Sequence, residues 1–307
     1  MTAGLLLLTL LQGAAAAAPP APVVSQVLAA QVMLDRAGFS PGEIDGREGP
    51  NVRRATTAFQ QSEQLDPSGA IDDATWRRLL ERTGGAPPLI SYTTDAADIA
   101  GPFIGELPRD LMAQAKLEAL GYGSALEALA ERFHSSPRLL RELNQHATFS
   151  APGESLFVPN AGTALPPLLA DDMLIVVTRR TSALTIEDAS GRVVFHAPVT
   201  SGSDHDPLPI GSWTVTTVQR NPKFHYNPDL FWDADPGHSK ATIPAGPNNP
   251  VGVVWIDLSK EHYGIHGTPE PSTVGHTQSH GCVRLTNWDA LRVAQWAWPG
   301  TRVEFRE

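Results

Sequence analysis

One short stretch of the sequence, Tyr263 to Leu285, brings together residue types that can perform nucleophilic chemistry. It contains Cys282, the only cysteine of the chain, preceded by the histidines His266, His276 and His280. A cysteine attacks a carbonyl only as a thiolate, so its free pKa of about 8.5 must be lowered by a base, a cation or backbone N–H groups. Glycines beside these residues would let a substrate approach closely. The stretch therefore predicts a thiol nucleophile with a histidine base.

The spacing of these residues predicts how the chain brings them together. His266 and Cys282 are 16 residues apart, which is too far for one face of a helix. We expect a strand that ends at His266, a polar loop, and a turn over 279–282 that returns the thiol to the imidazole. A zinc site built from His276, His280 and the same two residues is the chemical alternative, because all four are metal-ligand types. Their spacing fits no compact zinc framework, so we expect no metal and no cofactor.

The run HGTPEPSTVGHTQSHGCVRL resembles the signature of bacterial L,D-transpeptidases, in which a histidine, a loop and Ser/Thr-His-Gly-Cys follow one another. The resemblance implies that Cys282 is the nucleophile and that His266 is the general base and proton donor. It also implies that the carbonyl of Gly267 orients the imidazole. The N–H groups of Gly281 and Cys282 would form the oxyanion hole.

The candidates for substrate binding come from the same stretch and from a long aperiodic insert, residues 221–250. A loop of this length in a compact domain is usually functional or disordered, and the aromatic residues of the insert argue against disorder. We interpret it as a wall or lid of the substrate cleft; a satellite hydrophobic cluster is the alternative. The candidates are Arg284, which the resemblance sets against a substrate carboxylate, together with Ser279, His280, Tyr226 and Trp232.

Length and composition limit the classes of protein to which the chain can belong. With 307 residues, 41% of them hydrophobic and 18% charged, it is expected to be globular with two or three domains. A formal net charge of −10 argues against a nucleic-acid partner. A single cysteine allows no internal disulfide, so packing alone must hold the core.

The first residues, 1–22, read as a signal peptide. The apolar run Leu5 to Leu11 is followed by alanines, and it is too short for a bilayer span of about 20 residues. A signal peptide fits this pattern, although no Lys or Arg precedes Arg36. We therefore expect export to the periplasm or cell wall, with no transmembrane helix after processing.

Residues 25–83 are expected to form three short helices, because apolar residues recur at helical spacing. Asn51 is expected to cap the second helix and Asp72 the third. The phrases GFSPGEIDGREGPNVRRATTAFQ and GAIDDATWRRL resemble the type 1 peptidoglycan-binding module, over Ser25 to Leu80. The resemblance implies cell-wall binding without fixing contact residues; any other small three-helix domain is the alternative.

Residues 107–161 are expected to form a second small module, after a Gly- and Pro-containing linker over 84–106. Ser124 and Glu127 read as a capping box, and Ser136 before a proline begins another helix. A strand in GESLFVPN follows. The pattern is similar to LysM, a glycan-binding α+β unit, although its first strand is not evident; a helical spacer is the alternative.

Residues 172–306 form the expected catalytic domain, after a second linker, AGTALPPLLA. Flexible linkers would let the two wall-binding modules tether this domain. One helix is expected, capped by Thr286 and running to about Trp296. Short strands with few helices predict a sandwich-like, mainly-β domain, and the L,D-transpeptidase resemblance covers Met173 to Phe305. The expected strands are 173–178, 183–187, 193–198, 212–219, 251–258 and 301–305.

These observations together predict a multidomain peptidoglycan L,D-transpeptidase that cross-links the cell wall. By the resemblance, the Cys282 thiolate attacks a stem-peptide amide, releases D-alanine, and passes the acyl group through a thioester to an amine on a neighbouring strand. The expected partners are stem peptides, glycan strands and carbapenem-type inhibitors. Water as the acceptor would give an L,D-carboxypeptidase or another hydrolase, and a non-catalytic wall-binding scaffold is a further alternative.

Overall fold

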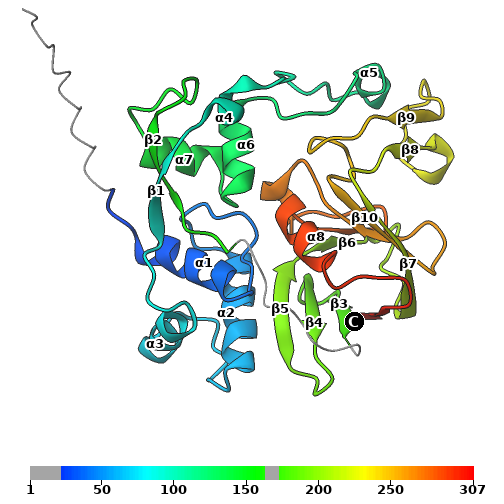
Figure 1. Cartoon of the computed structure of the whole chain (residues 1–307). Helices are drawn as coiled ribbons and strands as arrows, with labels where there is room; N and C mark the ends of the chain where they lie inside the picture. The colour runs from blue at the N-terminus through cyan, green and yellow to red at the C-terminus, as the bar shows by residue number, and fades with distance from the viewer. Residues whose placement is uncertain (1–21, 163–172) are drawn as a thin grey trace, which may run out of the picture.

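A computed structural model of the chain describes residues 22–162 and 173–307. The predicted signal peptide, except for its last residue, and most of the second predicted linker lie outside the described residues. None of the described helices has the length and apolar character that crossing a membrane requires. The described chain forms two small modules that lie against a larger domain built on a β-sheet (Figure 1).

The first module has the three helices that the sequence predicts: α1 (Gln26–Arg36), α2 (Pro50–Ser62) and α3 (Asp73–Arg82). Their core contains Leu34, Phe39 and Phe59. The side chain of Asp72 caps α3, as expected. The predicted cap at Asn51 is wrong, because the N-cap is Gly49, two residues earlier, and the Asn51 side chain is bonded to the catalytic domain instead.

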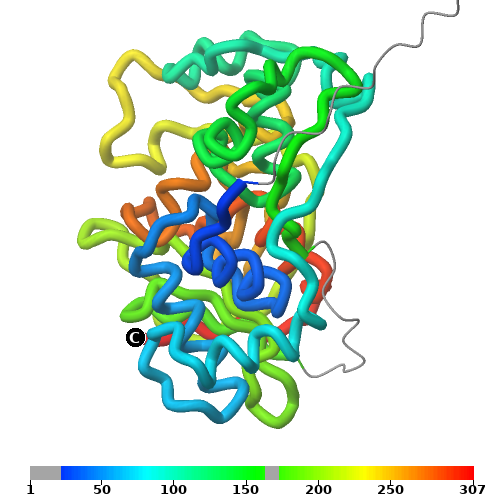
Figure 2. The backbone as a smooth tube through the Cα atoms, turned by 90° about the vertical axis from the view of Figure 1, so that its left-hand side faces the viewer, coloured from blue at the N-terminus to red at the C-terminus, as the bar shows by residue number. Residues whose placement is uncertain are grey.

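The middle module runs strand, helix, helix, strand. Strand β1 (Leu89–Thr93) pairs antiparallel with β2 (Ser155–Pro159), and α6 (Ala125–Arg132) and α7 (Pro137–Leu143) lie between them in sequence. Figure 2 views the modules from their own side and shows this one above the first. Ser136 caps α7 and Ser124 caps α6. The capping box is incomplete, because the Glu127 carboxylate accepts from the N–H of Gly123 rather than from that of Ser124.

The predicted linker over 84–106 is wrong for much of its length, since it contains β1 and helix α4 (Ala96–Ala100). Strand β1 is ordered by its pairing with β2 and by Tyr92, whose ring packs edge-on against Phe133 at 5.1 Å. Five residues between a proline pair and a helix cap carry too little periodicity to predict a strand. From α4 the chain runs across to the catalytic domain through α5 (Leu111–Gln114), as Figure 1 shows.

The catalytic domain is built on one nine-stranded mixed sheet, ordered β5-β4-β3-β13-β7-β10-β11-β12-β6. The β3–β13 and β11–β12 pairs are parallel. All six predicted strands are present, with ends shifted by up to three residues. The bounds are β3 (Leu174–Thr178), β4 (Ala183–Glu187), β5 (Val193–Pro198), β6 (Thr200–Ser201), β7 (Gly211–Arg220), β10 (Val254–Leu258), β11 (Gly264–His266), β12 (Val283–Arg284) and β13 (Arg302–Arg306).

The expected sandwich is one continuous sheet rather than two separate ones. The ten-residue strand β7 pairs with β13 through its first half and with β10 through its second half, so it joins the two parts. Both parts contribute side chains to one hydrophobic core, which helix α8 (Asn287–Val293) also enters. The predicted Thr286 cap of α8 is confirmed, and the helix ends three residues before Trp296.

The modules are joined to the catalytic domain by buried polar contacts. Asp35 of α1 binds Arg292 of α8, and the hydroxyl of Ser40 donates to Asp289 at 2.7 Å. His134 of the middle module stacks on Trp288 with ring centroids 5.2 Å apart. These contacts hold both modules against the catalytic domain, so the predicted tethering includes direct packing as well as linkers.

Candidate active site

The histidine and the cysteine are brought together by the parallel pairing of β11 with β12. His266 lies opposite Arg284, and Ile265 lies opposite Val283. Partnered residues of neighbouring strands share a face, and so do residues two apart on one strand. Cys282 directly precedes β12, so it lies on the same face as Arg284 and His266. The predicted strand, loop and returning turn are confirmed.

His266 is fixed in one tautomer. Its Nδ1–H donates to the carbonyl of Gly267 at 2.6 Å, which leaves the lone pair on Nε2. The side chain is buried, and the indole of Trp255 stacks on it with ring centroids 5.4 Å apart. Burial, with the charge of Arg284, lowers the pKa of His266 to about 3, against the opposing effect of the Gly267 hydrogen bond. The imidazole is thus neutral near pH 7 and able to accept a proton.

Cys282 is a free, half-buried thiol whose Sγ lies 3.7 Å from the carbonyl oxygen of His262. Burial raises the pKa of the Cys282 thiol, while the Gly264 backbone N–H and the Arg284 guanidinium act to lower it. The resting site therefore holds a neutral thiol near a neutral imidazole. Its thiolate has to form by proton transfer as a substrate is attacked.

The turn that leads into Cys282 depends on Gly281. Its φ of 98° lies in the left-handed region, and a Cβ there would meet the ring of Tyr263 at 2.7 Å. A side chain at this position would both strain the backbone and displace the tyrosine. Consecutive N–H groups in a turn of this kind point to one side and form an anion-binding concavity.

Ser279 holds the cysteine turn against strand β6. Its hydroxyl donates to the carbonyl of Cys282 and accepts from the N–H of Gly202, both at 2.7 Å. The side chain is buried, and both bonds are within the protein. These bonds do not support the predicted role of Ser279 in substrate binding, because its hydroxyl is already engaged in holding the turn that carries Cys282.

His280 connects the cysteine turn to the long insert. Its Nε2–H donates to Asp233 at 2.7 Å, and its ring lies 5.1 Å from that of Phe231. Trp232 is 59% exposed and stacks on His205 with centroids 4.8 Å apart. Both residues thus lie where the insert meets the cysteine turn. This placement is compatible with the predicted lid and with their expected role in substrate binding.

Tyr226 does not fit its predicted role in substrate binding. It is buried, and its hydroxyl lies 3.1 Å from Nδ1 of His238. With Leu120 of the middle module and Ile243 it forms a separate hydrophobic cluster. Strands β8 (Phe224–Tyr226) and β9 (Ala241–Ile243) carry this cluster as an antiparallel pair. The insert is therefore a hydrophobic cluster as well as a contact of the cysteine turn.

Arg284 has a guanidinium that is not fully paired in the protein. Its Nε is buried and has no hydrogen-bond partner within residues 22–162 and 173–307. Burial lowers the pKa of Arg284, opposed by the charges of Cys282 and Glu270. A planar guanidinium in such a place fits a bidentate carboxylate.

The histidines of the stretch have separate partners rather than a common centre. His266 bonds to Gly267, His280 to Asp233, and Nε2 of His276 lies 3.4 Å from the amide of Asn51. In the described part of the chain no three metal-ligand side chains gather into one group. This arrangement disfavours the zinc alternative.

Sequence reasoning missed Trp255, which covers one side of the site. Its ring lies so near Gly264 that a Cβ there would approach it to 2.5 Å. Trp255 alternates with the core residues Val254 and Ile256 and so faces the side of the sheet that carries His266. A large aromatic residue on the face opposite the core was the available signal.

Comparison with known proteins agrees with this geometry. A thiol and a tautomer-fixed histidine on one face of a mixed sheet are compatible with cysteine-dependent acyl transfer. Residues 172–305 match the L,D-transpeptidase catalytic domain, and residues 24–79 match a putative peptidoglycan binding domain. The chain belongs to the L,D-transpeptidase family and carries a peptidoglycan-binding module, as the two sequence resemblances predicted.

Two sequence relatives support this assignment, which does not depend on the structural similarity. The putative L,D-transpeptidase YqjB of Bacillus subtilis is 30% identical over 141 residues, 44% of this chain and 72% of the relative. The putative L,D-transpeptidase YkuD of the same species is 28% identical over 183 residues, 59% of this chain and 93% of the relative. The solved L,D-transpeptidase of Xylanimonas cellulosilytica is 18% identical with a TM-score of 0.39, covering 94% of this chain and 99% of that one.

Proposed function

We propose that this chain is a peptidoglycan L,D-transpeptidase in which Cys282 is the nucleophile and His266 is the proton acceptor and donor. The observation that carries the proposal is the β11–β12 register, which sets both residues on one face, with His266 Nδ1 bonded to Gly267. A nucleophile beside an oriented base is the recurring arrangement of covalent acyl transfer.

The first half-reaction cleaves the stem-peptide amide. His266 Nε2 takes the thiol proton as sulfur attacks the carbonyl, and the oxyanion forms against the N–H groups of Gly281 and Cys282. The tetrahedral intermediate then collapses. The C–N bond breaks, His266 returns its proton to the departing amine of D-alanine, and a thioester to Cys282 remains. Loss of one oxyanion donor typically costs about 2.7 to 4 kcal/mol of transition-state stabilisation.

The second half-reaction transfers the acyl group to an amine of a neighbouring stem peptide. The amine attacks the thioester, its surplus proton passes to His266, and the C–S bond breaks. The thiolate regains that proton, so the site returns to its starting state and a new amide cross-links two strands. The partly buried guanidinium of Arg284 is proposed to hold a carboxylate of the donor peptide.

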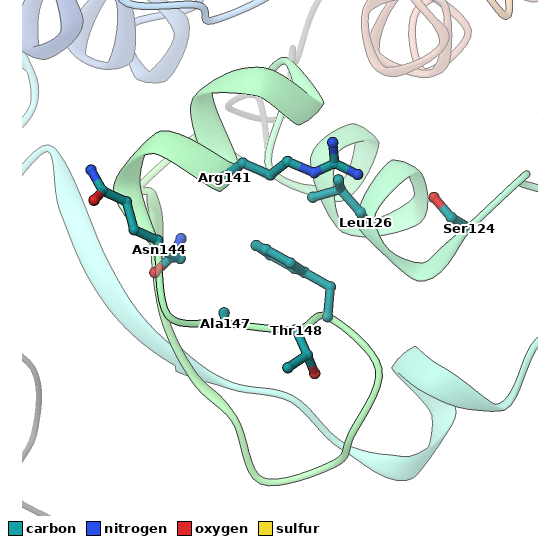
Figure 3. A pocket seen from close by; sticks show the side chains of 8 residues that line it. Ser124, Leu126, Arg141, Asn144, Ala147 and Thr148 are labelled. Atoms are coloured by element: carbon teal, nitrogen blue, oxygen red, sulfur yellow. The ribbon is translucent and has the colours of Figure 1, made fainter.

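The middle module, within proposed bounds of 84–162 rather than 107–161, is proposed to be a LysM-like glycan-binding unit. Its strand-helix-helix-strand order supports this, because β1 supplies the first strand that the sequence did not reveal. Between α6, α7 and residues 144–149 lies a pocket of about 320 Å³. Figure 3 shows Arg141 extending toward Leu126 there, with Thr148 on the opposite side. Polar groups around an apolar floor suit a carbohydrate.

Export to the periplasm or cell wall is part of the same proposal, because the polymer that the enzyme joins lies there. The apolar run Leu5 to Leu11 and the peptidoglycan-binding match at 24–79 support it.

The decisive experiment is mass spectrometry of the products formed from a purified tetrapeptide muropeptide. We expect a cross-linked dimer with loss of one D-alanine, and no product from Cys282→Ala. Tripeptide monomer as the sole product would instead identify water as the acceptor. No turnover by a protein whose thiol labels normally would identify a non-catalytic scaffold.

A further inference from the structure

A groove of about 510 Å³ lies where the three parts of the chain meet. The first module contributes the segment 43–52, and the middle module contributes Ser136 to Arg138. Pro271, Ser272 and His276 come from the loop that joins His266 to Cys282. The groove therefore borders the catalytic loop, and no element of the proposed reaction uses it.

The wall between the two modules is held by backbone bonds. The N–H of Ile44 donates to the carbonyl of His134 at 2.8 Å, and the N–H of Ser136 donates to the carbonyl of Ile44 at 3.0 Å. The guanidinium of Arg138 donates to the carbonyl of Asp45 at 2.7 Å. These bonds fix the relative position of the two modules along the groove.

The wall formed by the catalytic loop is held by helix α2. The amide of Asn51 donates to the carbonyl of Val274 at 2.9 Å, and the guanidinium of Arg54 donates to that of Gly275 at 3.3 Å. The groove is thus preformed, and the first module directly contacts the catalytic loop along it.

Two acidic groups of the groove, Glu43 and Glu48, have no partner among the described residues, and of these Glu48 is exposed while Glu43 is half-buried. The carboxyl of Glu43 forms no hydrogen bond or ion pair within residues 22–162 and 173–307. Asp45 accepts from Gln31, and Arg138 is paired with Glu142. Burial and the charge of Asp45 raise the pKa of Glu43 to about 7, with Arg138 opposing. A cation beside Glu43 would offset both the cost of burying its negative charge and the repulsion from Asp45.

We propose that this groove binds the side-chain ammonium of a peptidoglycan stem peptide, with Glu43 as its counter-ion. The inference rests on the proposed function for its choice of polymer. An ammonium supplies three donors and a compact charge, and a charge-assisted bond to a half-buried carboxylate is stronger than one between neutral groups. The bound amine stays protonated and cannot attack the thioester, so the groove is a docking site and the acceptor amine reacts elsewhere.

The test is calorimetric titration of the full-length protein, with or without its predicted signal peptide. The titrant is a stem-peptide fragment that ends in a diamino acid with a free side-chain amine. The same fragment acetylated on that amine is the matched probe. We expect acetylation to weaken binding at least tenfold. We expect Glu43→Gln to do the same to binding of the free-amine peptide, provided that the variant unfolds at the wild-type temperature. Glu118→Gln, an exposed carboxylate outside the groove, is the control and should bind as wild type.

The pH dependence supplies an independent readout. The other charged or titratable groups that line the groove are Asp45, Arg47, Glu48, Arg138 and His276. Because protonation of Glu43 removes the counter-ion, the dissociation constant should rise toward tenfold per pH unit below about 7. In Glu43→Gln that rise should be absent.

Carbapenem-treated protein separates the groove from the active site. If the free-amine peptide still binds after Cys282 has been acylated, that binding takes place in the groove. Equal binding of the acetylated and free peptides, or full binding by Glu43→Gln, would overturn the inference. Failure of the carbapenem to acylate the thiol would count against the proposed function instead. The comparison of the two peptides would still show whether the groove binds an ammonium.

Discussion

The carboxylate of Asp35, in the first module, forms two hydrogen bonds of 2.7 and 3.0 Å with the guanidinium of Arg292, in the catalytic domain. His134 of the middle module lies 3.1 Å from the same carboxylate. Burial alone would raise the pKa of Asp35, but the charges of Arg292 and His134 overcome it and hold the pKa well below its usual range. One buried carboxylate thus bonds to side chains of both other parts of the chain.

Replacement of Asp35 by Asn should strongly destabilise the protein. It would leave the guanidinium of Arg292, which is only 4% exposed, without the closer of its two carboxylate partners, so that only Asp289 remains, at 3.4 Å. Removing one partner of a buried pair typically costs about 3 to 5 kcal/mol. Urea unfolding should show the loss as a lower midpoint. Glu81→Gln, which breaks the exposed pair with Arg78, is the control and should leave the midpoint nearly unchanged; equal midpoints for the two variants would contradict the prediction.

Separation of the catalytic domain from its modules should impair it. A chain that begins near residue 168 loses the α2 contacts with β5, the Asn51 bond to Val274 and the partner of Arg292. We expect lower thermal stability and slower acylation by a carbapenem than in the longer chain. Equal acylation rates for the two chains would show that the contacts do not support the site.

His266 and His280 should differ sharply when each is replaced by Ala. Loss of His266 removes the base, and a loss of at least about 10²-fold in acylation and turnover is expected. His280 contacts Asp233 and Phe231 of the insert. Its loss should therefore reduce turnover while the thiol remains reactive. Carbapenem acylation followed by intact mass measures both variants, and the opposite ranking would refute the assignment of the base.

The acylation rate should stay nearly constant as the pH falls from about 7, because the neutral imidazole of His266 takes the thiol proton during attack. It should rise only as the pH approaches the pKa of the thiol, which burial raises above its ordinary value. Protonation of His266 should not limit the rate until the pH falls toward about 3. A stopped-flow pH profile of carbapenem acylation checks both limits. A fall in rate centred between pH 6 and 7 would show that the imidazole titrates normally.

Folding stability should depend on pH in the direction set by the same histidine. Its folded pKa of about 3 lies below the unfolded value near 6.5, so between these values the unfolded chain binds more protons. Stability should therefore fall as the pH falls from about 6.5. Asp35 adds to the loss only at lower pH, because its contribution is complete above its unfolded pKa and disappears as the pH falls through its depressed folded one. Thermal unfolding from pH 4 to 8, with His266→Ala as the comparison, measures this.

Local patterns allowed much of the fold and the reacting pair to be predicted. The six longer strands, the caps at Asp72, Ser136 and Thr286, and the pairing of His266 with the cysteine turn each depend on short-range spacing. The misassigned residues depend on tertiary contacts. Ser279 and Tyr226 are residue types that often bind substrates, yet their hydroxyls bond to Cys282 and His238 within the protein.

The contacts between modules could not be predicted from periodicity. The Asn51 amide looked like a helix cap because the type and position fitted, but its bond runs to Val274, more than two hundred residues away. Likewise Asp35 and Arg292 are ordinary charged residues of amphipathic helices until those helices are packed together. Long-range pairing of this kind leaves no trace in local sequence.

The hairpin formed by β8 and β9 has its core completed by another part of the chain. Leu120, from the middle module, is buried between Tyr226 and Ile243, and its backbone bonds to Ala245 and Asn248. A chimera in which an unrelated wall-binding module replaced residues 84–162 would leave this hairpin exposed, even with every catalytic residue intact. The units recognisable in the sequence are therefore not interchangeable. Recombination at their boundaries would separate the hairpin from side chains that complete its hydrophobic cluster.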